Sequence, residues 1–288
     1  MQHLVKTTIE ELSHWIEKPT SEDENFNQII QKIQTLFCEN KLKTIFRQYE
    51  YLDTWYSRNF IYQSLINNTL IFREKIAENG YYIIKIADKT ANKYKNNPPV
   101  IAFDLYLYWI ANVFIMNQIE KTKELVQIVN FHLDTNLLKG GVDYKPVAWF
   151  ILKLLNDYFG LEVDYSKYHI PKNMGIYEEV LLHKNSSDVD LVQELISQMA
   201  QYHILQSEPK NQSDMMSLQF CKAHEYIYAY EILVWLQYRH INGLSNPKVF
   251  SHSLMNLPHN QLPNNYPNIR FDDDIFNKIM NIYNLEEK

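Results

Sequence analysis

Glycine is scarce in this sequence: there are six in 288 residues, against a usual share of about 7%. Phosphate-binding loops, tight hairpins and β-bulges all need the positive φ that glycine adopts without strain. The chain cannot build many of these features. It also contains no G-x-S-x-G, G-x-x-x-x-G-K or C-x-x-C motif, so the common hydrolase, nucleotide-binding and redox signatures are missing.

Cysteines and long hydrophobic runs are also few. Cys38 and Cys221 are far apart and too few for a disulfide framework, so we expect two buried, reduced thiols in a cytoplasmic protein. Residues 1–15 lack the apolar core of a signal peptide. The most apolar run, residues 100–116, contains polar residues and is shorter than the ~20 residues that span a bilayer. We expect a buried helix there.

The charge balance is mildly acidic, with a formal net charge of −6. This sign disfavours nonspecific binding to nucleic acids or to anionic membranes, and it permits a basic protein partner. Hydrophobic residues make up 46% of the chain and charged residues 22%, which is ordinary for a globular domain. We therefore expect neither a nucleic-acid nor a membrane partner.

Aromatic residues are abundant: 21 Tyr, 14 Phe and 5 Trp. Apolar residues recur at helical spacing along most of the chain, and no segment alternates convincingly with period two. Pro146, for example, fits the first position of a helix that Gly160 ends. The sequence predicts a single all-α domain over residues 1–288, packed through large rings whose hydroxyl groups need partners.

The most apolar of these patterns covers residues 213–242, which we expect to form one long helix. Ser213 and Asp214 can cap its start, and Gly243 fits its end. Between Tyr226 and Tyr238 nearly every face is apolar or aromatic, which is typical of a helix surrounded by others. The predicted fold is an irregular bundle or array of antiparallel helices around this central one.

Prolines change the character of the chain after this helix. Four of them stand between residues 244 and 271, in a segment that is also rich in Asn. We expect an extended segment that lies over the surface, with a short helical piece near residues 249–255. An amphipathic helix from residue 272 to 284 closes the chain.

His224, Tyr228 and Glu231 form the most suggestive polar group, because they would share one face of the expected long helix. An unpaired carboxylate among apolar neighbours would be costly. One interpretation is a hydrogen-bonded core network that fixes the helix register. The others are the floor of a pocket or partner groove, and a catalytic site.

Other motifs for metal or nucleophilic chemistry are incomplete. The run from His224 to Tyr228 has Tyr where a zinc-protease helix has its second His. Glu11 and His14 form a single Glu-x-x-His, whereas a di-iron bundle needs two. Cys221 and His224 would lie side by side on one helix wall, and inert packing of the thiol is the simpler interpretation. We therefore predict no catalytic residue, metal or cofactor.

Asp272, Asp273 and Asp274 form a run of three carboxylates at the start of the last predicted helix. One or two acidic residues there would complement the helix dipole. Three, next to the Pro/Asn-rich segment, are more than a cap requires. The run is a candidate acidic surface for a basic partner.

Two features of the C-terminal third occur together: the aromatic helix with His224 and Tyr228, and a tail that reads SHSLMNLP from Ser251 to Pro258, followed by Leu262-Pro263. In these features the chain resembles a family of all-helical bacterial immunity proteins, which neutralise polymorphic or contact-delivered toxins. The resemblance implies a cytoplasmic protein that binds its cognate toxin and blocks the active site or the substrate path. It implies no catalytic residues.

Two other classes of function remain open at this stage. One is a helical scaffold or adaptor, including a secreted bacterial effector that acts through protein–protein binding. The other is a small-molecule-binding protein or enzyme that uses the His224, Tyr228 and Glu231 face. A toxin gene beside this one would favour immunity, and a deep polar pocket at Glu231 would favour a ligand or substrate.

Overall fold

The computed structural model describes the chain except for residues 20–24, 97, 136, 139–144, 208–217 and 287–288. Its described residues form eleven α-helices and no β-strand; the one bridge outside strands joins Ile101 and Leu138. The all-α prediction is confirmed. Among the described residues no helix is both long and apolar enough to cross a membrane.

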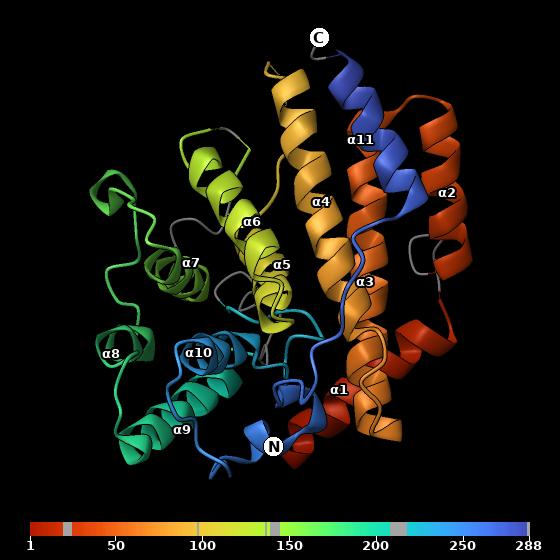
Figure 1. The fold of residues 1–288 in the computed structure, drawn as a ribbon. Coiled ribbons are helices and arrows are strands. Elements are labelled where there is room, and N and C mark those ends of the chain that lie inside the picture. The colour runs from red at the N-terminus through yellow and green to blue at the C-terminus, as the bar shows by residue number, and fades with distance from the viewer. Residues whose placement is uncertain (20–24, 97, 136, 139–144, 208–217, 287–288) are drawn as a thin grey trace.

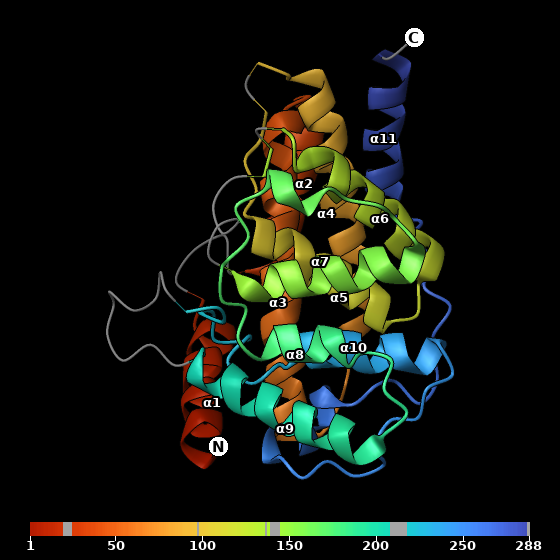
Figure 2. The same cartoon turned by 90° about the vertical axis from the view of Figure 1, so that its left-hand side faces the viewer.

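The helices run in two main directions (Figure 1). The N-terminal ones are α1 (Gln2–Glu17), α2 (Phe26–Cys38), α3 (Leu42–Asn67), α4 (Arg73–Lys93), α5 (Phe103–Ile115) and α6 (Ile119–His132). The C-terminal ones are α7 (Pro146–Phe159), α8 (Ile176–Leu182), α9 (Val189–Leu205), α10 (Tyr230–Ile241) and α11 (Asp274–Glu286). In Figure 1, α11, although C-terminal, runs upright together with α2, α3 and α4, whereas Figure 2 shows α7, α8, α10 and α9 lying across them.

Helix α5 joins these two groups. It packs against α4 and α6 on one side and against α7 and α10 on the other. Eleven of its 13 residues are buried, including Trp109 and Phe114. The expected helix for the apolar run at residues 100–116 is therefore present, and its polar Asn112 lies inside the core.

The expected long helix over residues 213–242 is present only in its second half. α10 begins at Tyr230, and the described residues 218–229 before it form turns; residues 213–217 lie outside the described part. The apolar pattern correctly indicated burial, since ten of the 12 residues of α10 are buried. It did not indicate that residues 218–229 are held by hydrogen bonds from other segments, which replace those of a helix.

The Pro/Asn-rich tail also differs from the expected extended surface segment. It contains two short 3₁₀ turns, η4 (Ser253–Asn256) and η5 (Pro258–Asn260), and η5 packs against α3. Leu254, Met255, His259 and Asn260 are completely buried. The short helical piece expected near residues 249–255 is thus a 3₁₀ turn further along, and part of the tail belongs to the core.

The two thiols differ from the expectation of two buried cysteines. Cys38 is exposed and Cys221 is partly buried, and both are free. Cys38 is exposed because it is the last residue of α2, where the helix leaves the core. Burial raises the pKa of the Cys221 thiol, and the negative charge of Glu225 raises it further. The thiol is therefore held in its protonated form, which is the less reactive one.

Candidate functional site

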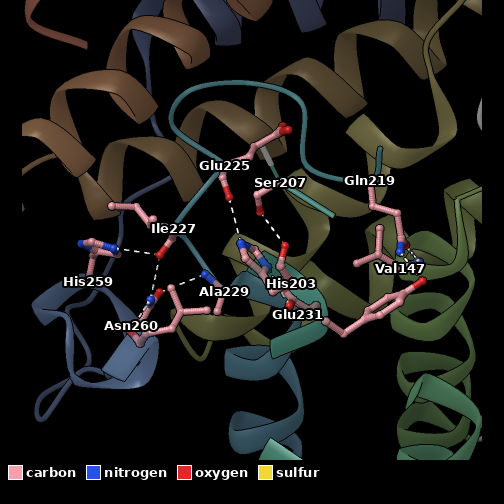
Figure 3. Close-up of polar contacts among 12 residues, drawn as sticks. Val147, His203, Ser207, Gln219, Glu225, Ile227, Ala229, Glu231, His259 and Asn260 are labelled. Carbon is pink, nitrogen blue, oxygen red and sulfur yellow. Dashed lines mark hydrogen bonds and ion pairs between the residues drawn. The ribbon is translucent and has the colours of Figure 1, made fainter. Parts of the chain in front are cut away.

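The candidate site is a buried set of polar side chains around residues 225–231, which we call the polar layer (Figure 3). It comprises His203 from α9, Glu231 from the first turn of α10, and His259 and Asn260 from the tail. All four side chains are fully buried. Each bonds to the backbone of residues 225–229 or to another member.

His203 and Glu231 form the ionisable pair of the polar layer. His203 Nδ1 lies 2.9 Å from Glu231 Oε1, and Nε2 lies 3.0 Å from the backbone oxygen of Glu225. Both ring nitrogens therefore face oxygen atoms. Phe220 stacks on the His203 ring, with 3.8 Å between the ring centroids. The stacked Phe220 ring and the two oxygen atoms together fix the imidazole in one orientation.

This geometry permits two proton arrangements. His203 can be an imidazolium that donates to both oxygens while Glu231 is ionised, or Glu231 can carry the proton and donate it to a neutral imidazole. The pair has zero net charge in both. Glu231 Oε2 has no hydrogen-bond partner among the described residues, so loss of His203 would leave a buried carboxyl group with no partner at all.

Asn260 replaces helical hydrogen bonds in the segment before α10. Its Oδ1 accepts from the backbone N–H of Ala229 at 2.9 Å. Its Nδ2 donates to the backbone oxygens of Ile227 and Leu254, at 2.8 and 2.9 Å. A buried backbone group without a partner is costly, and Asn260 satisfies three of them. This explains why residues 227–229 are buried without being helical.

His259 contributes to the same backbone position from the other side. Its Nε2 lies 3.0 Å from the Ile227 oxygen and its Nδ1 lies 2.8 Å from Ser64 Oγ. Burial lowers the pKa of His259 to about 3, so the ring is neutral. We assign the proton to Nε2, because the Ile227 carbonyl can only accept, and Nδ1 then accepts from Ser64.

Arg73 holds the tail in this position. Its guanidinium donates to the backbone oxygens of Gln261 (2.8 Å) and His259 (3.2 Å) and lies over the Phe60 ring. The side chain is 4% exposed. By donating to two backbone carbonyl groups, the guanidinium fixes the path of this irregular segment.

The structure does not bring the three residues predicted as one face into one network. Tyr228 donates to Asn112 Oδ1 at 2.7 Å, and Glu231 pairs with His203. His224 is buried, but its Nδ1 has no partner among the described residues. Burial, and then the positive charges of Lys222 and Arg58, hold the pKa of His224 well below its usual range. The three side chains thus have three different surroundings.

Asp53 is a buried carboxyl group that the sequence did not single out. It is 4% exposed and accepts a hydrogen bond from Trp109 Nε1 at 3.0 Å. Burial raises the pKa of Asp53 to about 7, and the Trp109 bond opposes that rise. Its other oxygen has no partner among the described residues. Asp53 is therefore a buried group whose charge changes near neutral pH.

Of the three carboxylates at the start of α11, Asp273 has a structural role: its Oδ1 accepts from the backbone N–H of Phe276 at 2.8 Å and so caps the helix. Asp272 accepts from Asn277 Nδ2 at 2.6 Å. Both Asp272 and Asp274 are exposed. The run therefore leaves two carboxylates on the surface beside one that caps the helix.

His203, His259 and Asn260 are the polar-layer residues that the sequence analysis missed. Among the described residues, no three His, Cys, Asp or Glu side chains are grouped so that they could hold a metal ion. The chain matches no protein-family model, and comparison with curated proteins and with solved structures finds no significant similarity.

Proposed function

We propose that this chain is an immunity protein, which binds a cognate, basic bacterial toxin in the cytoplasm and neutralises it by covering its active site. The observation that carries the proposal is the exposed pair Asp272 and Asp274, held at the start of α11 by the Asp273 cap. A fixed pair of carboxylates on a chain of net charge −6 suits a basic partner.

The polar layer supports a binding role in preference to a catalytic one. A catalytic group must reach a substrate. The polar atoms of His259 and Asn260 instead form hydrogen bonds with Ser64 and with the backbone oxygens of Ile227 and Leu254. The side chains of His203 and Glu231 are fully buried. In this proposal these residues make a rigid body, and function belongs to its surface.

Charge complementarity of this kind acts mainly on the rate of association. Opposite charges steer the encounter of two proteins, and salt screens them, with a Debye length of about 8 Å at physiological ionic strength. The proposal therefore predicts an association rate that falls as salt is added. Occlusion of the toxin's active site needs no chemistry from this chain.

The test is co-expression with the protein encoded by the adjacent gene, followed by pull-down and growth measurement. We expect that protein to be toxic alone, to bind this chain, and to be harmless beside it. Asp272→Lys with Asp274→Lys should weaken the complex. Asp190→Lys is the matched control, because Asp190 is also an exposed carboxylate in the first turn of a helix. A neighbour that is harmless and does not bind would contradict the proposal.

A further inference from the structure

Four aromatic rings form a partly exposed cluster on the side of the molecule where α2, α3 and α4 meet; we call them the aromatic patch. Phe26 begins α2, Trp55 and Tyr56 lie in the middle of α3, and Phe72 immediately precedes α4. Ring centroids are 4.7 Å apart for Phe26–Trp55, 5.3 Å for Trp55–Phe72 and 5.8 Å for Tyr56–Phe72. The rings pack on the core yet remain partly open to solvent.

The backbone at Phe72 is strained. Its φ is +74°, in the left-handed region that a bulky side chain rarely adopts. The other described non-glycine residues with positive φ are Asn40, Asn68 and Asn117, and Asn tolerates this conformation well. Phe72 is also the N-cap of α4 and makes no side-chain capping bond there. The position favours Gly or Asn for folding, so the phenyl ring calls for another explanation.

Exposed apolar side chains precede Phe72 in the chain, at the end of α3 and in its connection to α4. Ile71 is 51% exposed, Leu70 40% and Ile66 49%. Single exposed apolar residues are ordinary, but several beside a ring cluster are typical of a surface that another molecule covers. Aromatic residues are also the most frequent energetic anchors in protein interfaces.

Acidic groups lie beside the aromatic patch. The Tyr82 hydroxyl donates to Glu78 Oε1 at 2.9 Å and accepts from the backbone N–H of Asp273 at 3.1 Å, so one hydroxyl group contacts both acidic residues. The same two charges act on Tyr56. Burial raises the pKa of the Tyr56 hydroxyl to about 12, and the negative charges of Glu78 and Asp273 contribute to this rise. Lys75 pairs with Glu78 at 2.6 Å but is itself 54% exposed.

Helix α11 brings its exposed carboxylates to the same side. It packs on α4 and α2, and Figure 1 shows it in front of α3 with its first turn near the middle of that helix. The acidic edge therefore consists of Glu78, Asp273 and the exposed Asp272 and Asp274. The surface combines large rings, aliphatic side chains and carboxylates, of which Glu78 is paired with Lys75 and Asp272 and Asp274 are exposed.

We propose that the aromatic patch with this acidic edge is the surface that binds the protein partner, and that the partner's contact segment carries Lys or Arg beside large apolar side chains. This inference rests on the proposed function and specifies where the toxin binds. Cations are attracted both to carboxylates and to the faces of Trp and Tyr rings. The apolar side chains of the partner would cover Phe72 and its exposed neighbours.

A second copy of this chain is a poorer occupant. In a two-fold symmetric contact the same surface faces itself, so Glu78 and Asp273 of one copy would approach the acidic edge of the other. Like charges across an interface oppose association. Charge complementarity therefore favours a basic partner over self-association.

The decisive variant is Phe72→Gly, which removes the ring and accepts the positive φ. Asn68→Gly is its matched control, because it relaxes a left-handed position (φ 51°) without removing a ring. We expect Phe72→Gly to weaken binding of the adjacent-gene protein by about tenfold or more, and Asn68→Gly to leave it unchanged. Thermal melting would show that both are folded.

Glu78→Gln is a second variant that leaves all four rings in place. It removes one charge of the acidic edge while keeping an oxygen for Tyr82, and we expect a few-fold slower association and a weaker salt dependence. If folded Phe72→Gly and Glu78→Gln bind the adjacent-gene protein as the wild type does, the proposed surface is wrong. The immunity function would then stand and involve another face.

A probe that does not depend on the toxin separates the two proposals. It is a labelled amphipathic peptide of Lys and Leu, with a Glu and Leu peptide as control, titrated by fluorescence anisotropy. If the adjacent-gene protein does not bind but the basic peptide binds and Phe72→Gly abolishes this, the surface stands and the immunity function fails. If neither probe binds the wild type, both proposals fail.

Discussion

The polar layer and the aromatic patch use their residues in opposite ways. In the polar layer, side chains that could carry chemistry are fully buried, and Asn260 alone satisfies three backbone groups. In the aromatic patch, large apolar rings stay partly exposed, and Phe72 has a strained backbone and a side chain that makes no capping bond. In our proposal, the polar chemistry serves the fold and the apolar surface serves binding.

The largest effect should follow from breaking the buried pair of the polar layer. His203→Leu leaves Glu231 without its partner at a site of 0% exposure, and we expect a loss of about 3–5 kcal/mol in unfolding free energy. Denaturant titration measures this. The double variant with Glu231→Leu should recover part of the loss, because it removes the unpaired carboxyl group. A His203→Leu loss below about 1 kcal/mol would contradict the role of the pair.

The next effect concerns Asp53 and pH. The pKa of Asp53 is about 7 when folded and about 3.9 when unfolded, so the folded state holds the extra proton between these values. The unfolding free energy should therefore fall as pH rises from about 4 to 7, by at most about 4 kcal/mol. Asp53→Asn should flatten this fall, whereas Asp190→Asn, at an exposed position, should not. Equal pH profiles for wild type and Asp53→Asn would show that the carboxyl group is ionised throughout.

Asn260→Ala should have a somewhat smaller effect, of about 3 kcal/mol. It leaves the backbone groups of Ala229, Ile227 and Leu254 short of partners, and each unsatisfied buried group costs about 1–3 kcal/mol. His259 still bonds to Ile227, which limits the loss. Asn256→Ala is the control, since Asn256 is an exposed amide of the same tail. Equal urea midpoints for these two variants would mean that Asn260 does not hold the segment.

The smallest effect on stability should come from Phe72→Gly. Relief of the left-handed strain, worth roughly 1–2 kcal/mol, offsets the loss of a partly exposed ring, so the unfolding free energy should stay within about 1 kcal/mol of the wild type. A loss above about 3 kcal/mol in the same denaturant titration would place Phe72 with the core. The aromatic patch would then differ little from the polar layer.

The sequence predicted the all-α class because the helical spacing of apolar residues is a local pattern that can be read along the chain. Pro146 and Gly160 illustrate this, since α7 starts and ends where their conformational preferences require. It did not predict the turns at residues 218–229, because the hydrogen bonds that hold them come from His203, His259 and Asn260, up to 33 residues away. Long-range side-chain bonds of this kind leave no periodic signal.

The candidate site was predicted in part, for the same reason. One of the three interpretations placed Glu231 in a hydrogen-bonded core network, and Glu231 is buried with a hydrogen-bond partner. Its partner, however, is a lone His on an amphipathic helix, and nothing local distinguishes His203 from a surface residue. The strain at Phe72 also lies outside sequence reasoning, since a Phe gives no indication of positive φ.

One measurement tests the separation of folding from binding most directly: melting temperature and affinity for the adjacent-gene protein, determined together for Phe72→Gly and Asn260→Ala below both melting transitions. The account predicts that Phe72→Gly loses affinity by about tenfold or more and melts near the wild type, while Asn260→Ala melts lower and binds normally. The reverse pattern, with Asn260→Ala folded but unable to bind and Phe72→Gly binding normally, would contradict it.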